Sequence, residues 1–76
     1  MDNRFSLFVK KTPQPLRPIE EGETEETLRA DGVSVWDGDV VEMGGMVAVN
    51  PKDPADMWYV AKKFFEDSYV PLANLK

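Results

Sequence analysis

The sequence predicts an α+β domain in which a small antiparallel β-sheet packs against one C-terminal amphipathic helix. Short runs of alternating apolar and polar residues, typical of half-buried strands, occur between residues 4 and 49. A stretch with apolar residues at helical spacing follows nearer the C-terminus. With 76 residues the chain has room for a single domain, spanning residues 1–76.

Residues 4–9 form the first predicted strand, because Phe5, Leu7 and Val9 alternate onto one face. Three prolines follow within a few residues. Proline fixes φ and removes a backbone donor. Residues 10–24 are therefore predicted to form an extended Pro-rich and acidic segment on the surface.

A short helix is predicted over residues 23–30. Acidic residues crowd its start, where they suit the positive end of the helix dipole. Arg29 lies near its end, and Gly32 is placed to stop it.

A three-stranded antiparallel meander is predicted next. Its strands are residues 33–36, 39–43 and 46–49. Asp37-Gly38 and Gly44-Gly45 separate them, and both are dipeptides of the kind that close tight hairpins.

A second helix is predicted over residues 54–67, because Asp53 is a capping carboxylate and Pro54 suits the first helical position. Its apolar stripe would cover the sheet, and a short edge strand would follow at residues 69–72. The predicted core consists of Phe5, Leu7, Val9, Val35, Val40, Val47, Val49, Met57, Ala61, Phe64 and Phe65.

Composition argues against catalysis. The chain has no Cys and no His, which excludes disulfides, a thiolate nucleophile, an imidazole base and the usual zinc ligands. Asp37-Gly38-Asp39 resembles the start of a calcium loop, but the twelfth position is Ala48 where a Glu is needed. We expect no enzyme activity, no cofactor and no metal site. No apolar run is long enough to span a membrane.

Charge is unevenly distributed along the chain. Residues 1–19 carry four basic and one acidic side chain (+3), residues 20–42 one basic and nine acidic (−8), and residues 43–76 four of each (0). One interpretation of the −8 segment is a flexible, solvated acidic loop. The other is a negative surface that meets a basic groove on a partner. The candidate partner-binding residues are Glu20, Glu21, Glu23, Glu25, Glu26, Asp31, Asp37 and Asp39.

The aromatic residues offer a second kind of candidate site. Trp36 is interpreted as a core residue, whereas Tyr59 falls on the polar side of the predicted helix, so Trp58 and Tyr59 are candidate interface aromatics. With Lys62 and Lys63 they could line a homodimer interface that sequesters a small nucleotide signal. Direct binding of nucleic acid is not expected from a chain of net charge −5.

Three short motifs resemble parts of small uncharacterised phage and prophage proteins. They are Phe8-Val9-Lys10-Lys11-x-Pro13, Gly38-Asp39-Val40-Val41 and Phe65-Glu66-Asp67-Ser68-Tyr69-Val70-Pro71. The resemblance implies a mobile-element origin and action in the cytoplasm of an infected bacterium. It further implies a non-enzymatic, anti-CRISPR-like inhibitor that binds a host protein or ribonucleoprotein complex with a basic groove. A virion assembly accessory is the other alternative.

Overall fold

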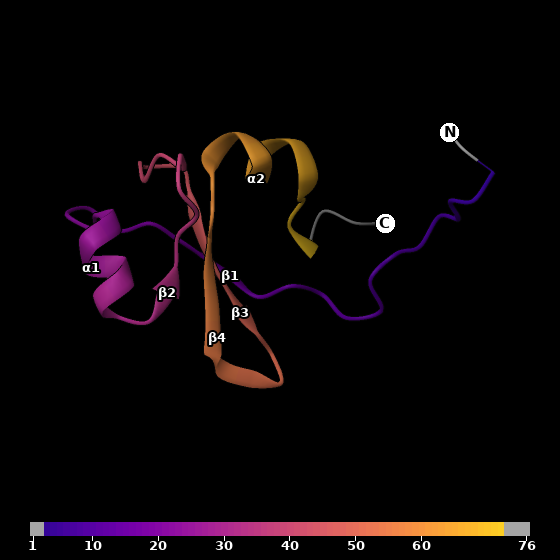
Figure 1. Cartoon of the computed structure of the whole chain (residues 1–76), viewed down its shortest axis with the longest axis horizontal. Coiled ribbons are helices and arrows are strands. Elements are labelled where there is room, and N and C mark those ends of the chain that lie inside the picture. The colour runs from indigo at the N-terminus through magenta and orange to yellow at the C-terminus, as the bar shows by residue number, and fades with distance from the viewer. Residues whose placement is uncertain (1–2, 73–76) are drawn as a thin grey trace.

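The computed structural model describes residues 3–72 and has a four-stranded sheet with two short helices (Figure 1). The predicted α+β class is confirmed, but the sheet is mixed and not purely antiparallel. The elements are β1 (Leu16–Pro18), α1 (Glu25–Ala30), β2 (Val33–Ser34), β3 (Met46–Asn50), β4 (Asp53–Val60) and α2 (Lys62–Ser68).

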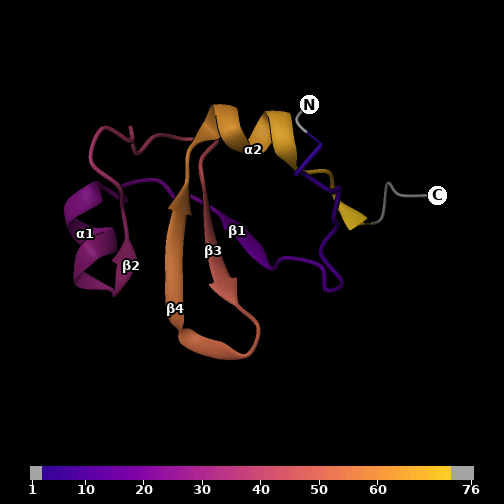
Figure 2. The same ribbon diagram turned by 45° about the vertical axis from the view of Figure 1, so that its right-hand side comes forward.

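The strands lie in the order β1-β3-β4-β2 (Figure 2). β3 and β4 form an antiparallel hairpin in which Val47 lies opposite Tyr59. β1 pairs antiparallel with β3, and Arg17 lies opposite Val47. β2 pairs in parallel with β4, with Val33 opposite Met57. The central hairpin therefore joins two very short edge strands.

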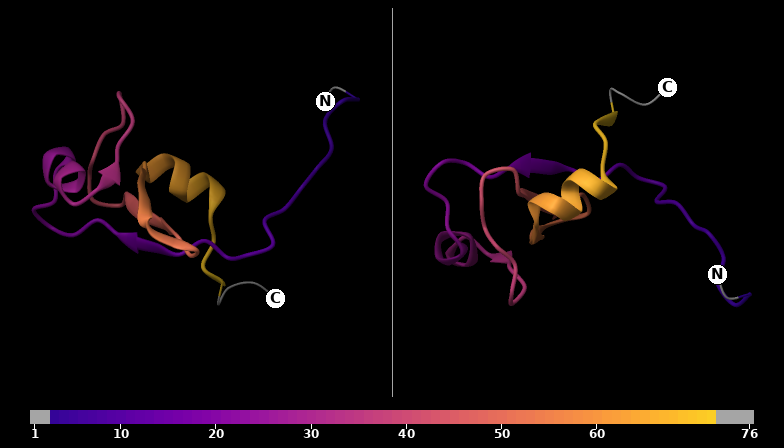
Figure 3. Two further views of the ribbon diagram at one scale, coloured as in Figure 1. Left: turned by 60° about the horizontal axis from the view of Figure 1, so that its bottom comes forward. Right: turned by 90° about the horizontal axis from the view of Figure 1, so that it is seen from above.

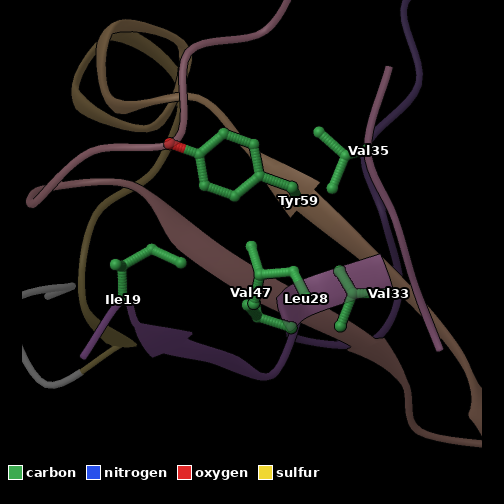
Figure 4. Close-up of a cluster of buried hydrophobic side chains, with 6 residues drawn as sticks. All are labelled: Ile19, Leu28, Val33, Val35, Val47 and Tyr59. Atoms are coloured by element: carbon green, nitrogen blue, oxygen red, sulfur yellow. The ribbon is translucent and has the colours of Figure 1, made fainter. Parts of the chain in front are cut away.

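The buried core lies between α1 and the sheet (Figure 4). Leu28 is the fully buried side chain of α1, so this helix covers the sheet. α2 has no buried residue, and the predicted cover by a long C-terminal helix is wrong. The core cluster consists of Ile19, Leu28, Val33, Val35, Val47 and Tyr59.

The predicted strand at residues 4–9 is wrong. This segment, called the N-terminal arm below, pairs with no strand among the described residues and runs away from the sheet (Figures 1 and 3). The free edge of β3 is taken instead by β1, which lies inside the predicted extended segment 10–24. The alternation of apolar and polar residues predicted a strand at residues 4–9, but no other described strand pairs with this segment.

The predicted helix at residues 54–67 is also wrong, because its first half is β4. Asp53 does accept a local hydrogen bond, from the Ala55 N–H at 3.1 Å, but the chain then continues extended. Pro54 is tolerated there because β2 pairs with β4 only from Met57 onward. The helix begins at Lys62.

The predicted meander is correct only in part. Residues 46–49 are a strand and residues 33–34 form β2, whereas residues 39–43 are a loop and residues 69–72 form no strand. The turn at Gly38 is confirmed, with φ of 91°. Gly44 also has a positive φ, but its turn leads from a loop into β3 and closes no hairpin.

The core prediction mixes correct and incorrect residues. Val35 and Val47 are buried, and Val49, Met57, Ala61 and Phe65 are half-buried. The predicted core residues that are exposed are Phe5, Leu7, Val9, Val40 and Phe64. The buried residues that the pattern missed are Ile19, Leu28, Val33, Ala48, Tyr59 and Val60.

Candidate binding surface

The acidic segment lies at one end of the molecule. Residues 20–42 form α1, β2 and the loop after β2, on the side of the sheet away from the N-terminal arm (Figures 1 and 2). Most acidic residues of the sequence are thus gathered at one end of the fold, whereas Arg4, Lys10 and Lys11 lie in the segment that leads away from the sheet. We call residues 20–42 the acidic end.

α1 is short but capped at both ends. The Thr24 hydroxyl accepts a hydrogen bond from the Thr27 N–H at 3.2 Å, and the Thr27 hydroxyl accepts one from the Thr24 N–H at 2.9 Å. Gly32, with φ of 89°, follows the helix end. The predicted helix at 23–30 is confirmed, and it begins at Glu25 because Thr24 is its cap. Capping compensates for the low intrinsic stability of six residues.

Glu23 is held by groups of its own chain. Arg17 donates two hydrogen bonds to its carboxylate, at 2.8 and 2.9 Å, and the Glu20 N–H donates a third at 2.8 Å. These bonds, those from Arg17 above all, lower the pKa of Glu23 to about 2. Glu23 therefore joins the turn before α1 to β1, and its carboxylate is not available to a partner.

Arg29 joins α1 to the chain that follows β2. Its Nη2 donates to the Val35 carbonyl at 2.7 Å, and its Nε lies 3.3 Å from a Glu25 carboxylate oxygen. A longer contact, 3.8 Å, reaches Asp37. Glu25 and Asp37 are thus partly neutralised at their own surface.

The other predicted carboxylates remain open to solvent. Within residues 3–72 no ion pair joins them to a lysine or arginine, and only Asp39 is half-buried. Glu42 is a further exposed carboxylate at this end, and the candidate set omitted it although the charge count included it. The open carboxylates of the predicted set are Glu20, Glu21, Glu26, Asp31 and Asp39.

Trp36 adds an apolar element to the acidic end. It is 76% exposed, which overturns the interpretation of Trp36 as a core residue. Its carbonyl accepts from the Asp39 N–H at 3.1 Å, so this exposed side chain stands at the start of a closed turn that contains Asp37 and Asp39. A large exposed aromatic is the type of residue that most often anchors a protein interface. The sequence signal for this exposure is the position of Trp36 next to the turn dipeptide Asp37-Gly38.

The second candidate pair does not form one surface. Tyr59 is only 4% exposed, so its prediction as an interface aromatic is wrong. Its hydroxyl donates to the Val40 carbonyl at 2.8 Å and accepts from the Glu42 N–H at 3.3 Å, and burial raises its pKa. Trp58 is half-buried, and successive residues of a strand point to opposite faces. Trp58 and Tyr59 therefore cannot stack on one ligand.

No protein-family model, curated protein or solved structure matches this chain. Among the described residues, no group of three or more carboxylates is arranged to hold a metal ion. In the same residues, neither helix has the length and apolar character needed to cross a membrane.

Proposed function

We propose that this protein is a non-enzymatic inhibitor whose acidic end binds a basic nucleic-acid-binding groove of a host defence complex. The observation that carries the proposal is the set of open carboxylates gathered at one end of the fold. They lie on a framework that Arg17 and Arg29 tie to the sheet and to the core.

A fixed framework matters because ordering a flexible acidic loop on binding would cost conformational entropy. The turn before α1 is held by Glu23, and the segment after β2 is held by Arg29. Carboxylates held in fixed positions can bind at the sites in a basic groove that otherwise bind the phosphates of a nucleic acid. Their field speeds encounter with a positive surface, and salt weakens this effect.

Trp36 supplies specificity that charge alone lacks. An acidic surface attracts any basic protein, whereas a projecting indole needs a pocket of matching shape. The partner that fits this end therefore has cationic side chains around an apolar depression.

The resemblance to small phage proteins supports the narrower target. It favours a host ribonucleoprotein of the CRISPR type and action in the bacterial cytoplasm. Two alternatives are less well supported. Sequestration of a nucleotide signal would use Trp58 and Tyr59 to stack on the ligand, and Tyr59 is buried. A virion accessory role has no structural feature in its favour among the described residues.

The test is affinity capture from a bacterial lysate, followed by competition. The bait variant replaces the five open carboxylates with isosteric amides: Glu20→Gln, Glu21→Gln, Glu26→Gln, Asp31→Asn and Asp39→Asn. The control carries Glu66→Gln and Asp67→Asn on α2, which are exposed and lie outside the acidic end.

We expect the wild-type bait and the control to capture a nucleic-acid-binding complex at low salt, and the five-site variant to lose it. The captured complex should release its labelled nucleic acid when free protein is added. Retention of the complex by the five-site variant, or no displacement of nucleic acid, would contradict the proposal.

A further inference from the structure

The N-terminal arm exposes an unusual amount of apolar surface. Phe5, Leu7, Phe8 and Val9 are 67, 84, 89 and 92% exposed. Isolated exposed apolar residues are normal, but four within five positions mark an interaction segment. In an extended segment Phe5, Leu7 and Val9 point to the same side, so the arm has one continuous apolar edge.

An apolar groove lies at the root of this arm. It has a volume of about 620 Å³ and runs between residues 10–14 and residues 68–72. Phe65 and Tyr69 stack at its wall with ring centroids 6.0 Å apart. Its apolar lining includes Leu16, Met46, Phe65, Tyr69, Val70 and Leu72. We call it the C-terminal groove.

We propose that the N-terminal arm of one copy lies in the C-terminal groove of a second copy, and that the exchange is reciprocal and forms a homodimer. The proposal is independent of the proposed function, because it uses the opposite end of the molecule.

A second copy is favoured over the chain's own arm by the direction of the backbone. Residues 10–14 already line the groove, and the arm then leads outward from the body (Figures 1 and 3). To fill its own groove, the arm would have to reverse direction directly after leaving it. A reciprocal exchange needs no reversal and uses the same two surfaces on each copy.

The edge strand β1 determines how the arm docks. Extension of the sheet at β1 is disfavoured, since Pro18 lies in this edge strand and Pro15 precedes it, and neither has an N–H to offer. The arm is therefore expected to dock through its side chains.

Sedimentation of the full chain over a range of concentrations tests the proposal. The arm variant is Leu7→Asp with Val9→Asp, and the groove variant is Val70→Asp with Leu72→Asp. All four positions are more than half exposed, so both variants should fold. The matched control is Val40→Asp with Met43→Asp, which are 63 and 61% exposed and lie outside the groove.

We expect a wild-type dimer, with a dissociation constant that rises about tenfold or more in the arm variant and in the groove variant. The control should match the wild type. An equimolar mixture of the arm and groove variants should dimerise more tightly than either alone, because one intact arm then meets one intact groove. A monomeric wild type would overturn the proposal, as would a dimer insensitive to either variant or a mixture that does not recover.

Discussion

Arg17 holds Glu23 in a fork of two parallel hydrogen bonds, from Nη1 to Oε1 at 2.8 Å and from Nη2 to Oε2 at 2.9 Å. Arg17 lies in β1, and Glu23 ends the turn that precedes α1. The pair thus fixes the start of the acidic end to an edge strand of the sheet. Bidentate geometry makes this bond both stronger and more directional than a single ion pair.

Glu23→Gln should make the protein less stable at neutral pH and less sensitive to acid. The pKa of Glu23 is about 2 in the folded state against an ordinary 4.5. A lowered folded-state pKa gives stability that is complete above pH 4.5 and is lost as the pH falls from 4.5 toward 2. We expect a loss of about 1 kcal/mol at pH 7, since Arg17 is partly exposed to solvent.

Urea unfolding of wild type and variant at pH 7 and at pH 3 measures this difference. Glu21→Gln is the matched control, because Glu21 is exposed and has no ion pair among the described residues. The difference between the variant and the wild type should be smaller at pH 3 than at pH 7, because part of the contribution of Glu23 is lost between pH 4.5 and pH 3. A difference that stays constant from pH 7 to pH 3 would show that the Arg17–Glu23 pair is not its source.

Leu28→Ala should be severely destabilising. Leu28 is the fully buried side chain through which α1 contacts the core. Such truncations cost about 2–5 kcal/mol, a large part of the stability of a small domain. Thermal unfolding followed by circular dichroism measures the effect.

Phe64→Ala is the informative comparison for Leu28→Ala. If residues 54–67 were an amphipathic helix on the sheet, Phe64 would be a core residue and its loss would cost about 3–5 kcal/mol. It is 60% exposed on α2, so we expect a loss of less than about 1 kcal/mol. Equal losses for Leu28→Ala and Phe64→Ala would contradict the observed packing.

The sequence pattern predicted elements correctly where local chemistry and tertiary packing agree. α1 is predictable because its acidic first turn, its Arg29 and its Gly32 all act within the helix itself. Residues 46–49 are predictable because their alternation is satisfied by strands on both sides. The clustering of acidic residues is also predictable, because residues 20–42 are consecutive in the sequence and therefore lie at one end of a small fold.

Failures occur where a local signal competes with long-range pairing. Asp53-Pro54 carries the chemistry of a helix start, yet the run Met57–Val60 gains more from pairing with β3. Residues 4–9 alternate like a strand, but β1 takes the edge of β3. The partner of Glu23 was not predictable either, because Arg17 lies in β1 and reaches Glu23 only in the folded chain. Glu25 and Arg29 are four residues apart in α1, a spacing that brings helical side chains together.

Tyr59→Phe should loosen the loop that connects the acidic end to β3. The Tyr59 hydroxyl donates to the Val40 carbonyl and accepts from the Glu42 N–H, so it fixes residues 40–42 from inside the core. We expect a stability loss of about 1 kcal/mol and faster hydrogen exchange at the amides of this loop. Unchanged exchange there would mean that the loop is held by other contacts.

Alkaline titration gives an independent check on the same hydroxyl. Burial raises the pKa of Tyr59 above its ordinary value of 10, so the folded state binds the phenolic proton more tightly than the unfolded state. Its contribution to stability is complete below pH 10 and falls as the pH rises beyond it. The stability of the wild type should therefore decline above pH 10 more steeply than that of Tyr59→Phe.

Gly45→Ala should perturb the same contact through crowding. Gly45 is buried, and a Cβ there would overlap the ring and hydroxyl of Tyr59. Because a rigid ring in the core has little freedom to move away, we expect a loss of about 1–3 kcal/mol. The double variant with Tyr59→Phe should lose less than the sum of the two single changes, since removing the hydroxyl relieves part of the overlap. Urea unfolding of the four proteins in this cycle measures the coupling, and strict additivity would show that Gly45 and Tyr59 do not meet as described.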